Sequence, residues 1–400
     1  MPRFEPFRGL RYDPDVAPIV QVIAPPYDVI SAVDRNHLAS RNPANSVLVE
    51  LPEADLPGKR DRYAVATDLF SRWQRDGILT PDAGPCLYPY RMIDTKGRAT
   101  TGVLGALGLA EPGQESDILP HEQTLPKPTS DRLDLLRATR ANLSPIWGLS
   151  MTPGLTATFD PTDDEPTFDA YDDDGVRHQL WVLSDLDALR AVSEAVATSP
   201  VVVADGHHRY ETARAYQAEC RAANGDQAGP HDLILALIVE LAEDQLTVGA
   251  IHRTVSGLPD GFDLVEALSP FFDVVRAGAA DDRTLGALGD SNSLAMVTGG
   301  QAYLLLPHSE VYDEAGNDLD SSLIAAALSH LPPHEVLHRH SVHEAIEALR
   351  GEHADAAFLL RPVTVSQIET WANERRRMPP KTTYFSPKPR TGMVFRSLDL

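Results

Sequence analysis

The sequence contains little positive charge. Its 400 residues include 35 lysine and arginine residues against 58 aspartate and glutamate residues, so the formal net charge is −23. Nucleic acids and anionic membranes are bound by basic surfaces, which so acidic a chain does not favour. We therefore expect neither a nucleic acid nor a membrane as a partner.

The features that mark secreted, membrane-spanning and metal-cluster proteins are also lacking. The two cysteines, Cys86 and Cys220, are too few for a disulfide framework or a metal cluster, and both are most simply buried apolar residues. No basic N-terminal segment precedes an apolar run, and no stretch approaches the roughly 18 apolar residues of a membrane span. We expect a soluble, cytoplasmic protein. The sequence has no P-loop and no glycine-rich nucleotide fingerprint.

Lysine is scarce even among the basic residues. A lysine carries a compact ammonium group that suits contacts to phosphate, so in an arginine-rich chain it can mark a position where such a contact is required. Codon bias produces the same pattern, and the count is a pointer only. The five lysines are Lys59, Lys96, Lys127, Lys381 and Lys388.

The chain is long enough to bury a large core, as two domains or one large one, because 42% of its residues are hydrophobic. Helical and strand patterns alternate along it, which predicts an α/β (α+β) fold with mixed sheets. We expect three parts: an N-terminal α/β part over residues 1–100, a core over 101–256, and a C-terminal α/β part with a basic tail over 257–400.

Several local patterns predict individual elements. Residues 62–76 form an amphipathic helical pattern, and residues 86–94 and 101–109 read as a β-hairpin. An alternating strand is expected over 46–51. Eight carboxylates lie between Asp160 and Asp174; their spacing lacks the calcium-loop register, so solvated hairpin turns are favoured over a calcium site.

One stretch carries the strongest chemical signal. Residues 201–204 predict a short buried strand, Asp205-Gly206 a turn, and the run from His207 a helix. A helix N-terminus favours an anion, whereas the cationic run His207-His208-Arg209 opposes the helix dipole there. A bound anion, such as phosphate with a divalent cation, would resolve that conflict. The alternative is that Asp205 merely caps the helix while the histidines face solvent; a zinc site with Glu211 is less favoured, because adjacent histidines seldom converge on one ion.

Two further segments bear ionisable groups framed by prolines. In the first, Glu122 after His121 could serve as a general base or be an ordinary loop glutamate. Lys127 and Arg132 could bind phosphate or pair with neighbouring aspartates. In the second, the tail from Trp371 to Leu400 carries seven basic residues against two acidic ones. Its lysines suit anion capture, and equally a basic strap docked on the acidic body.

Four motifs together resemble a widespread bacterial and archaeal family labelled as a domain of unknown function. They are Ala24–Asp28, His121–Thr124, Asp205–Tyr210 and Lys381–Lys388. Two of them are also similar to motifs of the free serine kinases of the ParB/sulfiredoxin superfamily, which phosphorylate L-serine to O-phosphoserine. The resemblance implies a ParB/sulfiredoxin-like core over residues 101–256 and a kinase that uses pyrophosphate or a nucleotide as donor.

The resemblance also implies roles for individual residues. Glu122 would activate the serine hydroxyl, and Asp205 would help hold Mg²⁺. The transferred phosphoryl group would be gripped by His207, His208 and Arg209. The remaining phosphate-binding residues would be His121, Lys127, Arg132, Lys381 and Lys388.

Two other functions stay open at this point. One is a non-catalytic regulatory protein that binds a nucleotide or a phosphorylated metabolite. The other is a phosphatase or pyrophosphatase, in which water replaces the hydroxyl acceptor. The oligomeric state does not follow from the sequence.

Overall fold

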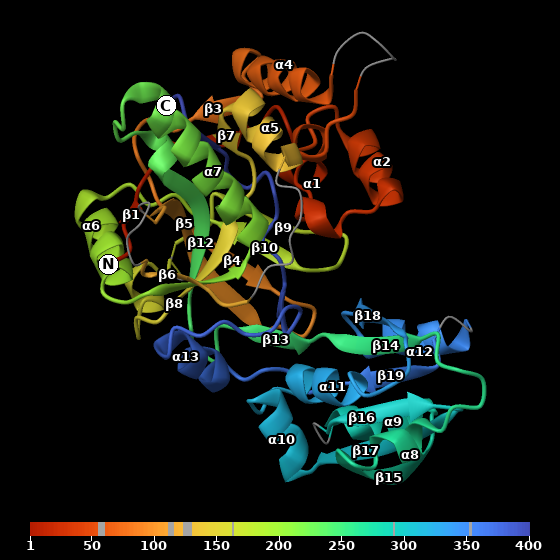
Figure 1. Cartoon of the computed structure of the whole chain (residues 1–400). Coiled ribbons are helices and arrows are strands. Elements are labelled where there is room, and N and C mark those ends of the chain that lie inside the picture. Colours follow the sequence, from red (N-terminus) through yellow and green to blue (C-terminus); the bar gives the residue numbers. More distant parts are fainter. Residues whose placement is uncertain (55–60, 111–115, 123–129, 162–163, 291–292, 352–353) are drawn as a thin grey trace. The chain divides into compact units, whose positions relative to one another are not determined.

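The chain forms two compact units. Figure 1 labels their helices and strands and colours the chain by residue number. The computed structural model describes residues 1–54, 61–110, 116–122, 130–161, 164–290, 293–351 and 354–400. Unit 1 comprises Met1–Thr247, Ala372–Arg375 and Pro387–Leu400, and unit 2 comprises Val248–Trp371 and Arg376–Ser386. The three parts expected from the sequence divide the chain differently, since the boundary at residue 100 falls inside strand β5 (Ala99–Gly108).

Unit 1 is built around a nine-stranded mixed sheet. Its spatial order is β6-β11-β8-β12-β5-β4-β10-β9, and β1 pairs with β5. The hairpin of β4 and β5 confirms the pattern at residues 86–109. The strands are β1 (Phe4–Glu5), β4 (Tyr88–Ile93), β5, β6 (Ile118–Pro120), β8 (Ile146–Ser150), β9 (Phe168–Tyr171), β10 (Arg177–Leu180), β11 (Val201–Asp205) and β12 (Leu233–Glu240).

The helices of unit 1 begin where the sequence supplies caps. Asp61 accepts a hydrogen bond from the Ala64 backbone at the start of α4, and Asp185 caps α6 in the same way. The helix expected over residues 62–76 is therefore confirmed. The helices are α1 (Ile19–Val22), α2 (Ala32–Arg41), α3 (Val47–Glu50), α4 (Arg62–Arg75), α5 (Ser130–Thr139), α6 (Leu186–Ala197) and α7 (His207–Asn224).

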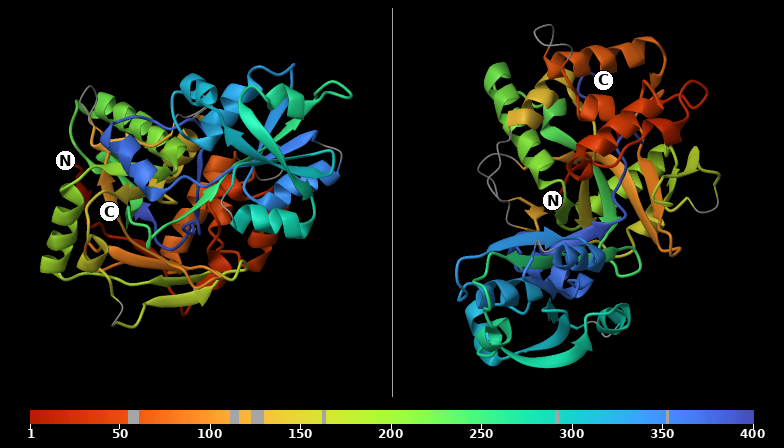
Figure 2. Two further views of the ribbon diagram at one scale, coloured as in Figure 1. Left: turned by 90° about the horizontal axis from the view of Figure 1, so that it is seen from below. Right: turned by 90° about the vertical axis from the view of Figure 1, so that its right-hand side faces the viewer.

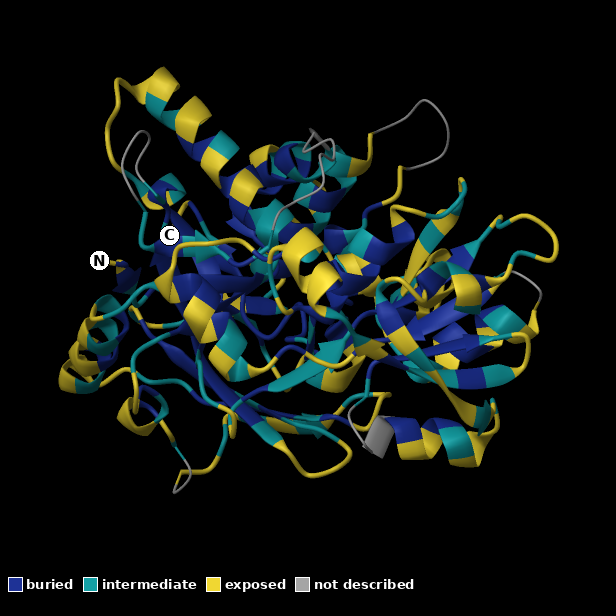
Figure 3. Cartoon of the chain, turned by 60° about the horizontal axis from the view of Figure 1, so that its bottom comes forward, coloured by how far each residue is buried: buried dark blue, intermediate teal, exposed yellow. Residues whose placement is uncertain are grey.

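The core of unit 1 lies between the sheet and its helices. Val192 of α6 and Tyr210 of α7 belong to the same buried cluster as Val201 and Val203 of β11. Figure 3 shows the consequence: the central strands are buried along most of their length, and exposed residues concentrate on loops and outward helix faces. Burial on this scale fixes β11 and the start of α7 relative to each other.

The C-terminal segment returns to unit 1 and packs into it. Phe395 is fully buried and pairs through its backbone with Leu10, while Thr391 pairs with Ala24. Figure 2 shows this segment, in dark blue, among the red and orange N-terminal elements. Two short strand pairs complete the unit, β2 (Leu10–Tyr12) with β3 (Leu79–Pro81) and β7 (Ala141–Asn142) with β21 (Arg396–Ser397).

Unit 2 contains a six-stranded antiparallel sheet in the order β15-β17-β16-β19-β14-β18, and a separate pair of β13 and β20. The strands are β13 (Thr247–Ala250), β14 (His252–Ser256), β15 (Phe272–Ala279), β16 (Ala295–Thr298), β17 (Gln301–Pro307), β18 (Glu335–Arg339), β19 (Ala356–Leu359) and β20 (Thr383–Ser386). The helices are α8 (Leu264–Leu268), α9 (Asp282–Asp290), α10 (Ser309–Ala315), α11 (Asp320–Leu328), α12 (Val342–Arg350) and α13 (Val365–Asn373). Taken with unit 1, these elements make the fold a mixed α+β fold with several sheets.

Two local predictions are wrong. Residues 46–51 contain the single-turn helix α3 instead of a strand, because the side chain of Asn45 accepts the Val47 backbone N–H and both Val49 and Glu50 are buried. The acidic turn between β9 and β10 is a hairpin as expected, but the Asp172 side chain is only 7% exposed and is not solvated. Among the described residues, no helix has both the length and the apolar character needed to cross a membrane.

Candidate functional site

The candidate site lies where two neighbouring parallel strands end. Strands β6 and β11 pair in parallel, with Val203 opposite Pro120. Residues that follow parallel strands emerge at the same edge of a sheet. This register places His121 and Glu122 beside Asp205 and the start of α7, although more than 80 residues separate them in sequence.

The turn from β11 to α7 leaves the helix N-terminus without a side-chain cap. Gly206 adopts φ +88°, and a Cβ atom there would come within 3.0 Å of the Arg209 side chain, so the position requires glycine. Gly206 itself occupies the N-cap position. The alternative in which Asp205 caps the helix is therefore wrong, and the first backbone N–H groups of α7 keep their capacity to bind an anion.

Asp205 is instead held by two cations. Its Oδ1 accepts a hydrogen bond of 2.7 Å from Lys388 Nζ, and its Oδ2 accepts one of 3.0 Å from Arg209. Burial alone would raise the pKa of Asp205, but the charges of Lys388 and Arg209 outweigh it and lower the pKa below its usual value. Asp205 is therefore ionised. Its carboxylate holds the Lys388 ammonium and the Arg209 guanidinium close to the N-terminus of α7.

Two imidazole rings meet above the strand ends. His121 Nδ1 donates to the Val203 carbonyl at 2.6 Å, and the ring lies 5.0 Å from the ring of His207. Because Nδ1 already carries a proton, His121 Nε2 bears one only in the imidazolium form, in which it pairs with Glu122 Oε1 at 3.3 Å. His121 Nε2 and Glu122 Oε1 therefore face each other at this edge of the sheet.

His207 is half-buried, and its imidazole ring is neutral. Desolvation, aided by the nearby His121, lowers its pKa to about 3. Its Nε2 atom is buried and has no hydrogen-bond partner among the described residues. A buried, unsatisfied imidazole nitrogen is costly for stability, and a ligand that supplies a partner would remove that cost.

Replacing His207 by glutamine should flatten the acid side of the stability profile. An unfolded histidine titrates near pH 6.5, whereas the folded pKa is about 3. Stability from a neutral His207 is complete above the unfolded pKa and declines as pH falls toward the folded pKa. Urea unfolding from about pH 7 to about pH 4 should therefore show a smaller decline for His207→Gln than for the wild type. Equal slopes for the wild type and His207→Gln would contradict a lowered pKa of His207 in the folded protein.

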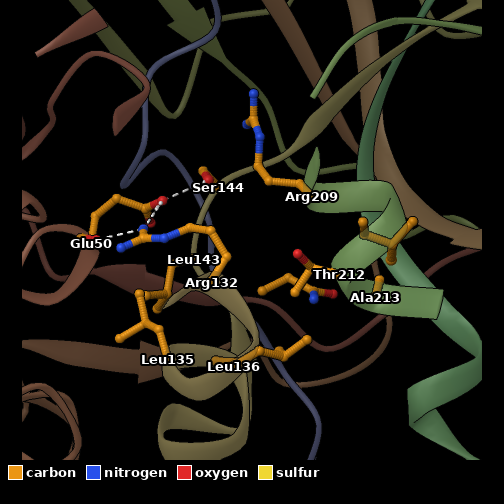
Figure 4. Close-up of a pocket in the computed structure, with 12 residues that line it drawn as sticks. Glu50, Arg132, Leu135, Leu136, Leu143, Ser144, Arg209, Thr212 and Ala213 are labelled. Atoms are coloured by element: carbon orange, nitrogen blue, oxygen red, sulfur yellow. Dashed lines mark hydrogen bonds and ion pairs between the residues drawn. The ribbon is translucent and has the colours of Figure 1, made fainter. Parts of the chain in front are cut away.

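A small cavity next to Arg209 is lined by residues of α5 and α7 and by Glu50 and Ser144 (Figure 4). The ring of Tyr27 lies under two guanidinium groups, 4.5 Å from that of Arg132 and 5.9 Å from that of Arg209. Glu50, whose pKa is raised by burial, pairs with Arg132 at 3.5 Å and accepts 3.1 Å from Ser144. The cavity has a volume of ≈ 60 Å³, which is too small for a nucleotide.

The structure brings six of the residues singled out in the sequence to one edge of the unit 1 sheet. They are His121, Glu122, Asp205, His207, Arg209 and Lys388.

The other four predicted residues are not among these six. His208 is half-exposed, 3.9 Å from Glu211. Arg132 joins Arg209 at Tyr27, where it donates to the Glu50 carbonyl. Lys381 belongs to unit 2, where its carbonyl accepts from Arg253. Lys127 lies outside the described residues.

Tyr27 and Glu50 were missed by the functional reading of the sequence. Tyr27 stands in the motif Ala24–Asp28, which supported the family resemblance but suggested no chemistry. Its contact with both guanidinium groups gives that motif a role in orienting the arginines. For Glu50 the only available signal was its place in an apolar segment, where a buried carboxylate needs a cationic partner.

Comparison with known proteins gives the following matches. The model of a family described as "Protein of unknown function (DUF1015)" matches residues 4–328. A free serine kinase in complex with AMP is 14% identical, covers 67% of this chain and 83% of its own, and has a TM-score of 0.36. A conserved hypothetical protein from Pyrococcus furiosus is 12% identical over 71% of this chain and 93% of its own, with a TM-score of 0.37. SbnI with C-terminal truncation from Staphylococcus aureus is 14% identical over 73% and 86%, with a TM-score of 0.38. No curated protein matches the sequence.

Proposed function

The chain belongs to the DUF1015 family of proteins of unknown function, and we propose that it is a phosphotransferase acting on a small hydroxyl acceptor. The proposed acceptor is free L-serine, which becomes O-phosphoserine, and the donor is pyrophosphate or a nucleotide. The choice of serine rests on the motif resemblance to free serine kinases. The choice of phosphoryl transfer rests on the site itself.

One observation carries the proposal. An uncapped helix N-terminus, two cations and a carboxylate beside an imidazole meet at the ends of β6 and β11. Phosphoryl transfer needs little covalent chemistry from the protein; it needs a positioned hydroxyl, a base and groups that stabilise the charge of the phosphoryl oxygens. The Glu122 carboxylate at this edge of the sheet could serve as the base, and the α7 N–H groups with Lys388 and Arg209 could stabilise the phosphoryl charge.

In the proposed reaction Glu122 accepts the proton of the acceptor hydroxyl as its oxygen attacks the terminal phosphorus of the donor. The bond between that phosphorus and its bridging oxygen breaks, and the leaving group departs with the electron pair as phosphate or a shortened nucleotide. The N–H groups of α7, with His207, His208 and Arg209, bind the transferred phosphoryl group. Lys388, His121 and Arg132 offset the remaining negative charge of the donor.

Magnesium is the proposed cofactor. Within the described residues no group of three or more potential ligand side chains converges on one point. Mg²⁺ usually takes only one or two carboxylates and completes its shell with water and substrate phosphates, so Asp205, the proposed ligand, needs no large set of further protein ligands. When bound, the ion would neutralise charge on the donor phosphates.

The proposal is tested with purified protein, Mg²⁺ and L-serine, offered pyrophosphate, ADP or ATP in turn. Phosphorus NMR should show an O-phosphoserine signal that requires both serine and one of the donors. Release of phosphate without phosphoserine would replace the kinase by a hydrolase. Binding of a donor with no turnover would replace it by a non-catalytic, phosphometabolite-binding protein.

A further inference from the structure

Lys388 owes its position to a buried network on the other side of the tail segment. It lies in the run Pro387-Lys388-Pro389-Arg390, in which prolines on both sides of the lysine restrict the backbone. Fixing Arg390 two residues further on therefore restricts where the Lys388 ammonium can reach. Arg390 is only 8% exposed, and its guanidinium points into the β9–β10 hairpin of unit 1.

The hairpin grips that guanidinium with two carboxylates. Arg390 Nε donates to Asp172 Oδ2 at 2.8 Å, a second nitrogen also contacts Asp172, and that nitrogen donates to Asp174 at 2.8 Å. Asp172 is almost fully buried, whereas Asp174 is exposed. Burial alone would raise the pKa of Asp172, yet the hydrogen bond from His178 and the charge of Arg390 hold it well below its usual value. Asp172 is thus an ionised, buried partner of Arg390.

The backbone of Arg390 is fixed through the same network. Its N–H donates to the Tyr90 hydroxyl oxygen at 3.3 Å, and Tyr90 contacts His178 Nδ1 at 2.7 Å. His178 Nε2 lies 2.8 Å from Asp172, and burial lowers the pKa of His178, so the ring is neutral. Because the Asp172 carboxylate only accepts, Nε2 carries the proton and Tyr90 donates to Nδ1. The Arg390 backbone N–H, the Tyr90 hydroxyl and His178 Nε2 each then donate to an acceptor within this network.

We infer that Asp172 is a positioning residue, which holds Lys388 on Asp205 by fixing Arg390. The inference deepens the proposed function, since it concerns how one phosphate-binding cation of that site is placed. Asp172 itself contacts neither Asp205 nor Lys388 in the described contacts and acts through Arg390 alone. The acidic hairpin therefore serves the site even though its aspartates lie outside it.

Lysine acylation measures the position of Lys388 without relying on activity. The chain has five lysines, so mass spectrometry of peptides from protein treated with limiting acetic anhydride resolves each one. An ammonium held in an ion pair reacts slowly, and Lys96, exposed in the β4–β5 turn, is the internal reference. In Asp172→Asn the labelling of Lys388 relative to Lys96 should rise roughly tenfold, the effect of weakening a charge-assisted hydrogen bond.

Asp173→Asn is the matched control, because Asp173 lies in the same turn but pairs with Arg41 and not with Arg390. Its Lys388 labelling should stay at the wild-type level. Arg390→Lys tests the network from the other side, and should raise Lys388 labelling even if Asp172→Asn fails to fold, as judged by thermal unfolding. Unchanged Lys388 labelling in every folded network variant would overturn the inference.

Kinetics separate this inference from the proposed function. If the protein transfers phosphoryl groups, Asp172→Asn should raise KM for the donor more than it lowers kcat, because the variant misplaces a donor-binding cation and leaves the base intact. Higher labelling of Lys388 in a protein without phosphotransfer would sustain the positioning role and reject the proposed function. If the protein is active but Asp172→Asn changes neither the Lys388 labelling nor the donor KM, the proposed function stands and the positioning role is rejected.

Discussion

Replacing Glu122 by glutamine should lower the rate of phosphoserine formation by about 10²- to 10⁴-fold, the usual contribution of a general base. Glutamine keeps the size of the side chain and can still contact His121, but it cannot accept the hydroxyl proton. The loss should therefore appear in kcat, while donor affinity changes little. Steady-state kinetics with L-serine and the active donor measure both quantities.

Glu219→Gln is the control for this substitution. Glu219 lies in the C-terminal half of α7, far along the helix from its N-terminus, and forms an exposed ion pair with Arg137. Exposed pairs of this kind contribute little to stability, so the variant should keep wild-type activity. A Glu122→Gln protein with an unchanged kcat would show that another group takes the proton and would remove Glu122 from the mechanism.

Replacing Lys388 by methionine should weaken binding of magnesium pyrophosphate by about 10- to 100-fold. The substitution keeps the aliphatic stem and removes the ammonium, so an anion at the α7 N-terminus loses a cation that lies 2.7 Å from Asp205. Asp205 then keeps only Arg209 as a described partner, and its charge repels the incoming phosphate more strongly. Both effects act in the same direction.

Isothermal titration calorimetry at fixed ionic strength measures this loss of affinity. Lys96→Met removes the same charge from an exposed turn and should leave the affinity unchanged, which excludes a general effect of net charge. Equal weakening in the two variants would mean that Lys388 acts at long range only. Equal affinities in the wild type and in Lys388→Met would place the pyrophosphate elsewhere.

The parts of the fold that local patterns decide were predictable from the sequence. The β-branched run at Val201 followed by Asp205-Gly206 leads into α7, and the hairpin of β4 and β5 has the expected turn. Alternating and helical spacings of apolar residues indicate which face of an element is buried. That signal comes from residues that lie close together in the sequence. Residues 46–51 show where this fails, because a one-turn helix buried on several sides can carry an alternating sequence.

The candidate site was predictable as a set of residue types but not as an arrangement. Lys388 meets Asp205 across 183 positions in the sequence, and no spacing rule links a strand end to a tail segment. Asp172 looked like a solvated turn residue because its partner Arg390 lies 218 positions away in the sequence. Tyr27 is uncharged near neutral pH, so its residue type does not mark it as part of a charged site. Only the fold shows that the guanidinium groups of Arg132 and Arg209 both contact its ring.

The phosphate site at the ends of β6 and β11 is tested most directly by a crystal structure of the full chain with magnesium and pyrophosphate. The expected result is a phosphate group at the first turn of α7, with its oxygens within hydrogen-bond reach of Lys388 and the backbone N–H groups. The other phosphate should extend toward His121 and Glu122, leaving room for the acceptor. Pyrophosphate bound elsewhere, with Lys388 still paired to Asp205 and no anion at the helix N-terminus, would contradict the proposed site.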